Sequence, residues 1–243
     1  MTGRLKLRGT WPGPIALRRG WALATARPWN DESPDAHLRL IRGSAEFLES
    51  AAAAVPVGGG AVLSPPLASG STAIWEEAGF RPHLVLDMFQ RELLAGATPP
   101  TVPVLAGEEG EWDHAIEIDR AAFEPLWRLG ATGLKEALNA TPTSVFLTVR
   151  GDTGNTVGFA IVGAGAATGY LQRVAVDPDH ARQGYGRALV RASLGWARQH
   201  GCRTMLLNTQ PENEPAGRLY ESEGFTRVAA GLVIWSRDGR SEP

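Results

Sequence analysis

The chain has 243 residues, 43% of them hydrophobic and 21% charged, which is typical of a folded globular protein with a sizeable core. Its 24 basic and 26 acidic residues give a formal net charge of −2, so no excess of basic residues points to nucleic acid or to an anionic membrane. The single cysteine, Cys202, excludes an internal disulfide, no apolar run reaches the roughly 20 residues of a transmembrane helix, and no signal peptide is recognised. We therefore expect a cytoplasmic protein.

In the first hundred residues, the predicted elements lie between residues 61 and 89. Residues 61–63 (AVL) are predicted as a strand, residues 73–80 (AIWEEAGF) as a helix that ends in Gly-Phe, and residues 81–89 (RPHLVLDMF) as another strand. The stretch 94–105 (LAGATPPTVPVL) is rich in proline and small residues, which indicates a boundary. Since the length suits two small domains, we expect them at residues 1–98 and 101–243.

The second domain shows alternating strand-like and helical patterns. Its predicted strands are residues 102–106, 144–150, 156–165, 169–176, 204–209, 225–230 and 231–236. Its predicted helices are residues 108–123, residues 129–141, a segment through Leu189 and Ala197 that stops at Gly201, and residues 213–224 with Asn213 as N-cap.

The loop at residues 177–190 (DPDHARQGYGRALV) places Gly184 and Gly186 at the start of a predicted helix. Glycines let backbone N–H groups approach a ligand closely, and the first N–H groups of a helix lack partners and lie at its positive end. The loop therefore predicts an anion site, for which phosphate or diphosphate is the usual occupant. It matches neither GxGxxG nor GxxxxGK[ST], and glycines kept for close packing are the alternative.

Four segments, taken together, resemble the GNAT (GCN5-related N-acetyltransferase) superfamily over about residues 101–237. They are LQRVAVDP (171–178), ARQGYGRAL (181–189), LLNTQPEN (206–213) and AGRLYESEGF (216–225). The resemblance implies an α/β (α+β) fold with a mixed, mostly antiparallel sheet flanked by helices and two parallel strands splayed at the coenzyme A site. The family's loop pattern is R/Q-x-x-G-x-G/A, and Ala181 departs from its first position.

What the resemblance implies about the cofactor is acetyl-CoA, with its pantetheine arm paired to the backbone of the strand at 169–176 and its diphosphate on the glycine loop. Tyr220 matches the tyrosine that usually protonates the departing sulfur, and a phenol of pKa near 10 suits that role. The residues expected to bind the cofactor are Val174, Ala175, Val176, Arg182, Gln183, Gly184, Tyr185, Gly186, Arg187, Asn208, Asn213 and Tyr220.

The general base is not identified by the sequence. Several GNAT enzymes carry a Glu on the strand before the loop, where this chain has Tyr170, Gln172 and Arg173, and the ribosomal-protein N-terminal acetyltransferases carry a Glu near the position of Asn208. The remaining candidates are carboxylates in the region of the first two helices, which are either bases acting through water or solvated charges: Glu117, Asp119 and Glu124. The residues proposed to contact the acceptor are Glu117, Glu124, Trp127 and Tyr170; the i, i+4 spacing of Phe123 and Trp127 also fits core packing.

The N-terminal domain is expected to be a truncated GNAT-like copy that has no coenzyme A loop. Residues 73–80 resemble residues 218–225 at an offset of 145, with Trp75 at the position of Tyr220. Only Arg42-Gly43 stands near the place of the glycine loop.

These observations predict an N-acetyltransferase that moves an acetyl group from acetyl-CoA to a primary amine by direct attack. The alternative is an acyl-CoA sensor or scaffold with a GNAT fold and no turnover. Peptide α-amines, lysine, polyamines, aminoglycosides and small metabolite amines all stay open as acceptors. We expect no metal, and a monomer or homodimer.

Overall fold

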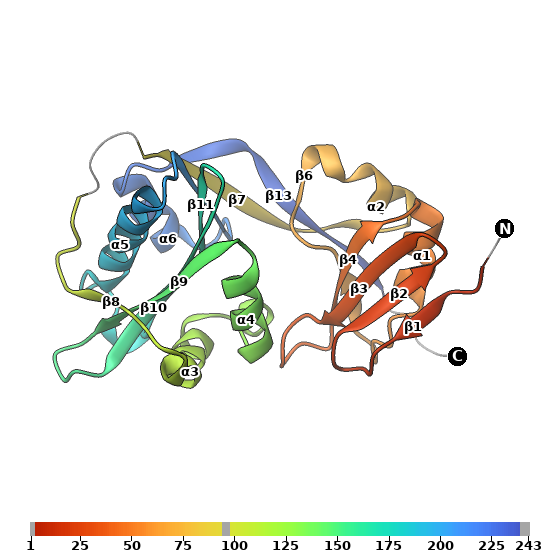
Figure 1. Cartoon of the computed structure of the whole chain (residues 1–243), viewed down its shortest axis with the longest axis horizontal. Helices are drawn as coiled ribbons and strands as arrows, with labels where there is room; N and C mark the ends of the chain where they lie inside the picture. The colour runs from red at the N-terminus through yellow and green to blue at the C-terminus, as the bar shows by residue number, and fades with distance from the viewer. Residues whose placement is uncertain (1–2, 94–97, 239–243) are drawn as a thin grey trace. The chain divides into compact units, whose positions relative to one another are not determined.

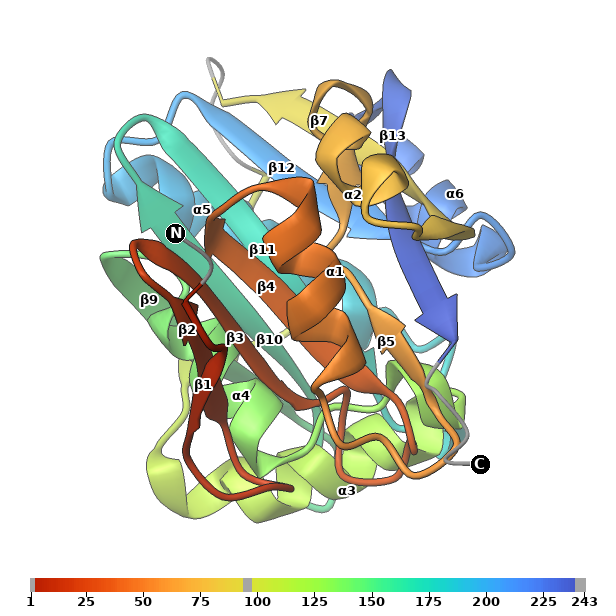
Figure 2. The same ribbon diagram turned by 90° about the vertical axis from the view of Figure 1, so that its right-hand side faces the viewer.

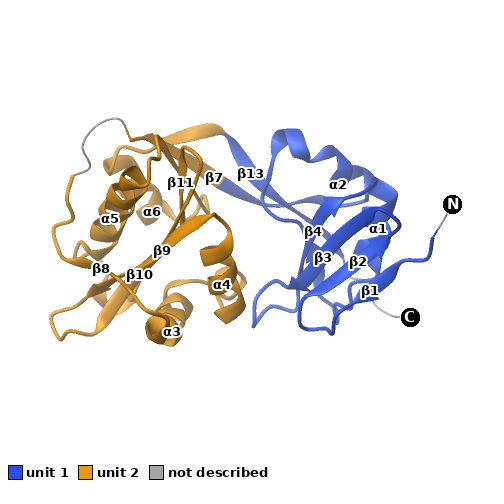
Figure 3. Ribbon diagram, viewed as in Figure 1, with its two compact units in different colours: residues 1–86, 230–243 blue, residues 87–229 orange. Residues whose placement is uncertain are grey.

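The computed structural model describes residues 3–93 and 98–238, and the chain divides into two compact units (Figures 1 and 3). Unit 1 comprises residues 1–86 and 230–243, and unit 2 comprises residues 87–229. This division differs from the expected 1–98 and 101–243, because β7 (Arg81–Glu92) begins in unit 1 and ends in unit 2, and β13 (Thr226–Asp238) does the reverse. Within the expected boundary segment 94–105, residues 94–97 lie outside the described residues.

Unit 2 is built on a sheet with the strand order β8-β9-β10-β11-β12-β7. Neighbouring strands are antiparallel except β11 and β12, which are parallel. The expected mixed, mostly antiparallel sheet is thus confirmed. Its other strands are β8 (Val104–Ala106), β9 (Thr143–Arg150), β10 (Thr156–Gly165), β11 (Thr168–Val176) and β12 (Thr204–Thr209).

Helices pack on this sheet through the alternating side chains of β10. Ile161 of β10 packs with α3 and α4, whereas Val162 belongs to the core that α5 covers. The helices and 3-10 turns are α3 (Trp112–Ala122), α4 (Ala131–Asn139), α5 (Tyr185–Gln199), α6 (Glu214–Ser222), η2 (Glu109–Glu111), η3 (Pro125–Trp127) and η4 (Pro178–His180). Each helix predicted in this half of the chain is therefore confirmed.

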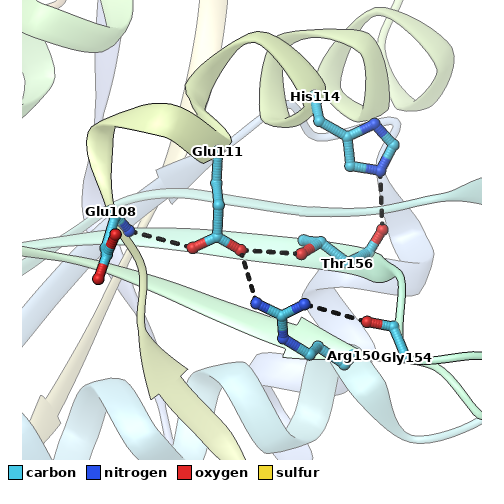
Figure 4. A network of polar contacts seen from close by, with 6 residues as sticks. All are labelled: Glu108, Glu111, His114, Arg150, Gly154 and Thr156. Atoms are coloured by element: carbon cyan, nitrogen blue, oxygen red, sulfur yellow. Dashed lines mark hydrogen bonds and ion pairs between the residues drawn. The ribbon is translucent and has the colours of Figure 1, made fainter.

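Polar contacts join the start of α3 to the hairpin of β9 and β10 (Figure 4). The Glu111 carboxylate accepts hydrogen bonds from the Glu108 backbone N–H (3.0 Å), the Thr156 hydroxyl (3.0 Å) and Arg150 Nη2 (3.3 Å). His114 Nε2 lies 3.0 Å from the Thr156 carbonyl oxygen. This network holds α3, which carries the predicted acceptor residue Glu117, against the sheet.

Unit 1 repeats the strand arrangement, with the order β1-β2-β3-β4-β5-β13 and a parallel pair of β4 and β5. It differs in that β1 leads directly to β2, whereas α3 and α4 lie between β8 and β9 of unit 2. Helix α1 (Ala45–Ala53) follows β4 and lies across the sheet (Figure 2), where it buries Phe47 and Leu48. Helix α2 (Ala73–Glu77) follows β5, as α6 follows β12. The remaining elements are β1 (Lys6–Arg8), β2 (Ile15–Arg19), β3 (Ala22–Pro28), β4 (Ala36–Arg42), β5 (Ala61–Leu63), β6 (Leu67–Ala68) and η1 (Ser69–Ser71).

The two strands predicted at residues 225–230 and 231–236 form one continuous strand, β13, so that prediction is wrong. Gly231 does not make a turn. A Cβ atom at this position would lie 2.6 Å from the carbonyl oxygen of Leu86 in β7. The glycine therefore permits a close approach of two backbones within the sheet.

Candidate functional site

The parallel strands β11 and β12 diverge after a short paired stretch. Thr168–Tyr170 of β11 pair with Thr204–Leu206 of β12, and the rest of β11 pairs only with β10 on its other edge. A cavity of about 400 Å³ lies along this divergence, lined by β11, the following loop, the start of α5, the end of β12 and α6. The backbone around Val174 and Val176 thus offers hydrogen-bonding groups to a ligand.

A β-bulge lies in β11 next to the cavity. Ile161 of β10 is opposite Arg173 and Val162 is opposite Leu171, so Gln172 is an additional residue. Regular alternation would place Gln172 and Arg173 on opposite faces of the sheet. Instead both side chains lie on the α3 side, because Arg173 contacts Asp119 of α3 and a Cβ atom at Gly163 would collide with the Gln172 amide.

Helix α5 begins without a side-chain cap. Its N-cap, Gly184, has a φ of 89°, and Arg182 two residues earlier has a φ of 62°. The first helical hydrogen bond runs from the Ala188 N–H to the Gly184 carbonyl at 2.9 Å, so the preceding N–H groups of α5 have no partner within the helix. A Cβ atom at Gly184 would meet nothing within 4 Å. The positive end of α5 is therefore open, as an anion site requires.

The two arginines beside the loop glycines have different surroundings. Arg182 lines the cavity. Arg187 Nη1 lies 2.7 Å from Oε1 of Glu223, and Arg191 Nε lies 2.9 Å from Oε2. Glu223 is 6% exposed, and its backbone oxygen accepts a hydrogen bond from Arg91. The side chain of Arg187 therefore holds α5 to the end of α6, and a carboxylate already offsets its charge.

Tyr220 lines the cavity from α6, whose N-cap Asn213 accepts a backbone N–H through Oδ1 at 3.3 Å. The Tyr220 ring packs on Phe89 and Phe225, with ring centroids 5.8 and 5.9 Å away. Burial raises the pKa of Tyr220 to about 12, and the positive charge of Arg173 acts in the opposite direction. The phenol is therefore protonated at neutral pH and available as a hydrogen-bond donor.

Arg173 is held in place by three residues around the cavity. Its Nε and Nη2 lie 2.6 and 2.8 Å from the two carboxylate oxygens of Asp119, and Nη2 also donates to the Trp127 carbonyl oxygen at 2.7 Å. The guanidinium carbon lies 3.6 Å from the centroid of the Phe123 ring. Asp119 is fully buried and also accepts the Leu129 N–H at 2.7 Å. This candidate base is thus engaged in an ion pair.

Most residues predicted to bind the cofactor line the cavity: Val174, Val176, Arg182, Tyr185, Gly186, Asn208, Asn213 and Tyr220. Ala175 is buried in the core under α3, and Gln183, Gly184 and Arg187 lie outside the cavity lining.

The four predicted acceptor residues do not come together in the cavity. Trp127 lines it, whereas Glu117, Glu124 and Tyr170 are exposed residues outside its lining. Glu117 Oε2 lies 3.1 Å from His114 Nδ1. Hydrogen bonds to Glu117 and to the Thr156 carbonyl raise the pKa of His114.

Five polar residues that were not predicted as site residues also line the cavity: Gln172, Arg173, His180, Thr209 and Gln210. The two residues of β11 were missed because the bulge, which changes the direction of a side chain, has no clear sequence signal. His180 follows the Asp177-Pro178 turn, and its Nδ1 lies 3.2 Å from the Asp177 carboxylate. Its position just before the glycine loop was the signal that could have identified it.

Residues 3–93 and 98–238 contain no group of three or more His, Cys, Asp and Glu side chains suited to hold a metal ion. Over the same residues, no helix combines the length and the apolar character needed to cross a bilayer.

The family model of the acetyltransferase (GNAT) family matches residues 112–225. These residues form a GNAT domain. The resemblance seen in the sequence is thus confirmed.

The [ribosomal protein bS18]-alanine N-acetyltransferase of Escherichia coli is 39% identical over 90 residues, which are 37% of this chain and 61% of that protein. The mycothiol acetyltransferase of Geodermatophilus obscurus is 41% identical over 71 residues, 29% of this chain and 23% of that protein. The chain therefore matches less than two thirds of the length of these relatives.

The likeness to solved structures extends beyond the residues that the family model matches. A tandem GNAT protein from the clavulanic acid biosynthesis pathway superposes with a TM-score of 0.64 at 14% identity, covering 94% of this chain and 83% of that one. At this level of identity the likeness concerns the fold alone. The superposed part of the chain includes unit 1, whose strand order matches that of unit 2.

Proposed function

We propose that this chain is an acetyl-CoA-dependent N-acetyltransferase that moves an acetyl group to a primary amine by direct attack. The observation that carries this proposal is the open N-terminus of α5, which contributes with Arg182 and Tyr220 to one cavity between diverging parallel strands. Unpaired N–H groups at a helix start suit a diphosphate, and the unpaired edge of β11 suits the amides of a pantetheine arm. The GNAT domain and its acetyltransferase relatives support the same reaction.

Within this proposal, the loop and the strands divide the binding of acetyl-CoA. The backbone N–H groups of residues 183–187 and the Arg182 side chain would hold the diphosphate. The backbone of residues 174–176 would pair with the pantetheine arm, and Asn208 and Asn213 would contact it from the ends of β12 and α6. Arg187 would contribute through its N–H, because Glu223 engages its side chain.

The reaction requires a proton for the departing sulfur. The amine nitrogen attacks the thioester carbon, the C–S bond breaks, and the thiolate receives the phenolic proton of Tyr220. The Tyr220 pKa of about 12 lies above the roughly 8.5 of a thiol, so proton transfer to a separate thiolate is uphill. Donation therefore has to accompany C–S cleavage, next to the positive charge of Arg173. The N–H groups near Val174 would stabilise the carbonyl oxygen as its negative charge develops.

Removal of the amine proton is assigned to water. The described residues that line the cavity include no Asp or Glu. Asp119 is paired with Arg173, and Glu117 and Glu124 lie outside the lining. An acceptor amine would then react from its neutral form, which an α-amine of pKa about 8 populates far more than a lysine of pKa about 10.4.

Two measurements test the proposal. Calorimetry with acetyl-CoA tests binding, and release of free thiol against a panel of amines tests transfer. Binding together with amine-dependent thiol release supports the enzyme. Binding without release for any amine favours the alternative, an acyl-CoA sensor. Absence of acetyl-CoA binding contradicts both.

We further propose that unit 1 is a truncated GNAT copy that binds no coenzyme A. At the start of α1 the Ser44 hydroxyl accepts the Phe47 N–H at 3.3 Å, so a side chain occupies the position that is open in α5. Trp75, at the place of Tyr220, is 3% exposed and packs edge-on against Phe80, with ring centroids 4.9 Å apart. The shared strand order supports descent of both units from one ancestor.

A further inference from the structure

Two residues on the α3 side of β11 carry hydrogen-bond donors that have no partner among the described residues. Arg173 uses Nε and Nη2 for Asp119 and Trp127, and its Nη1 has no partner among the described residues. The Nε2 of Gln172 is buried and likewise has no hydrogen-bond partner in the described part of the chain. Both residues line the cavity. A buried donor is normally satisfied, so Gln172 Nε2 lacks an acceptor that the described residues do not supply, and Arg173 Nη1 beside it is available for the same acceptor.

The charges around the cavity favour an anionic partner for these donors. Arg173 and Arg182 are the two arginines of its lining, in which no carboxylate occurs among the described residues. Asp119 offsets the charge of Arg173, but it covers only the Nε and Nη2 edge. An acceptor with several cationic groups would lose its hydration in this cavity without gaining a counter-ion.

On the basis of the proposed N-acetyltransferase activity, we propose that the acceptor is an amine that also carries a carboxylate, which Arg173 Nη1 and Gln172 Nε2 bind. Charge-assisted hydrogen bonds from a guanidinium to a carboxylate are among the strong ones in proteins. Asp119, Trp127 and Phe123 already fix the guanidinium, so little conformational freedom is lost on binding. The β-bulge is what brings both donors to one face.

Arg173 also lowers the pKa of Tyr220 electrostatically, and this effect must be separated from carboxylate recognition. An effect on Tyr220 changes the rate for every acceptor by the same factor, whereas loss of a carboxylate contact affects only acceptors with that group. Pairs of acceptors that differ only at the carboxylate therefore distinguish the two roles.

The experiment measures thiol release from acetyl-CoA with amino acids and dipeptides, each beside its C-terminal carboxamide, and with spermidine. We expect the carboxylate member of each active pair to have the higher kcat/KM, by roughly 10- to 100-fold and mainly through KM. The amine of a carboxamide is the less basic one and is more readily neutral, so this preference cannot come from amine reactivity.

Arg173→Lys and Gln172→Leu are the test variants, and Arg218→Lys is the matched control, since Arg218 is exposed and pairs with Glu214 at 2.8 Å. Both test variants should lose most of the preference, measured as the ratio of kcat/KM within each pair, whereas Arg218→Lys should keep it. Gln172→Leu keeps the Arg173–Asp119 pair, so it remains informative if Arg173→Lys does not fold.

The outcomes separate this inference from the function on which it rests. Turnover that is equal or faster with carboxamides or spermidine overturns the carboxylate site but leaves acetyl transfer in place. If Arg173→Lys lowers kcat/KM equally for both members of each pair, Arg173 acts only through Tyr220. That result also overturns the carboxylate site. Acetyl-CoA binding without thiol release for any amine contradicts the proposed transfer itself.

Discussion

Arg187 Nη1 and Glu223 Oε1 lie 2.7 Å apart, and this contact makes Arg187 part of the folded scaffold. Glu223 also holds Arg191 and is 4% exposed at its side chain. Glu223→Gln should lower the free energy of unfolding by about 2 kcal/mol, because two arginines lose a charged acceptor. Urea unfolding measures this, with the exposed Glu221→Gln as control. A loss no larger than that of the control would contradict a structural role for the pair.

The same contact predicts unequal contributions of two arginines to cofactor binding. Arg182 lines the cavity, whereas Glu223 holds Arg187. Arg182→Met should weaken acetyl-CoA binding roughly tenfold, and Arg187→Met by much less, although both remove one positive charge. Isothermal titration calorimetry gives both dissociation constants. An equal or larger effect at Arg187 would mean that its side chain leaves Glu223 to bind the ligand.

Sequence reasoning predicted most of unit 2 because its signals are local. Alternating and helical hydrophobic patterns predicted each of its helices and the strands from β8 to β12. The sequence also predicted Asn213 as the N-cap of α6. Nothing was predicted before residue 61, where β1 to β4 are rich in Ala and Arg, and their burial alternates only once they are packed. The reciprocal placement of β7 and β13 depends on pairing between distant segments, which local patterns do not encode.

The sequence predicted those parts of the candidate site that follow from backbone motifs. The glycine loop and Tyr220 were found because their spacing is fixed by a helix start and a helix face. The pairing of Arg173 with Asp119 joins residues 54 positions apart and depends on a bulge, so neither the partner nor the direction of the side chain followed from the sequence. The engagement of Arg187 by Glu223 was missed for the same reason.

Two substitutions at Gly184 separate backbone strain from ligand binding. Its φ of 89° disfavours any other residue, so Gly184→Ala should cost about 1 kcal/mol of stability, although a Cβ atom meets nothing within 4 Å. Gly184→Glu carries the same strain and adds a negative charge at the start of α5. We expect it alone to abolish acetyl-CoA binding measured by calorimetry. Retained affinity in folded Gly184→Glu would contradict the anion site.

The pKa of His37 leads us to predict that the folded protein loses stability in acid. Burial, followed by the charges of Arg27 and Arg39, lowers its pKa from 6.5 to about 4. Between these values the unfolded chain binds a proton that the folded chain does not, so the free energy of unfolding falls as pH drops from 6.5 towards 4. At pH 4.5 this amounts to about 2 kcal/mol. Urea unfolding at pH 7 and 4.5 should show a smaller acid loss in His37→Gln than in the wild type, and the exposed His83→Gln should match the wild type.

Tyr220 allows its ionisation and its chemical role to be measured on the same variant. The chain has three tyrosines, and burial raises the pKa of Tyr220 to about 12. Ultraviolet titration should therefore show one phenol that ionises about two pH units later than a solvated tyrosine, and Tyr220→Phe should remove that step.

If Tyr220 protonates the departing sulfur, Tyr220→Phe should reduce kcat by roughly 10²- to 10⁴-fold, the usual contribution of a general acid. Its acetyl-CoA affinity should stay nearly unchanged, because the ring that packs on Phe89 and Phe225 is kept. Tyr185→Phe is the matched control, since this phenol lies at the start of α5 and has no proton-transfer role in the proposed mechanism. Full activity of Tyr220→Phe would remove the phenol from the mechanism. A parallel loss of affinity would instead assign Tyr220 to cofactor binding.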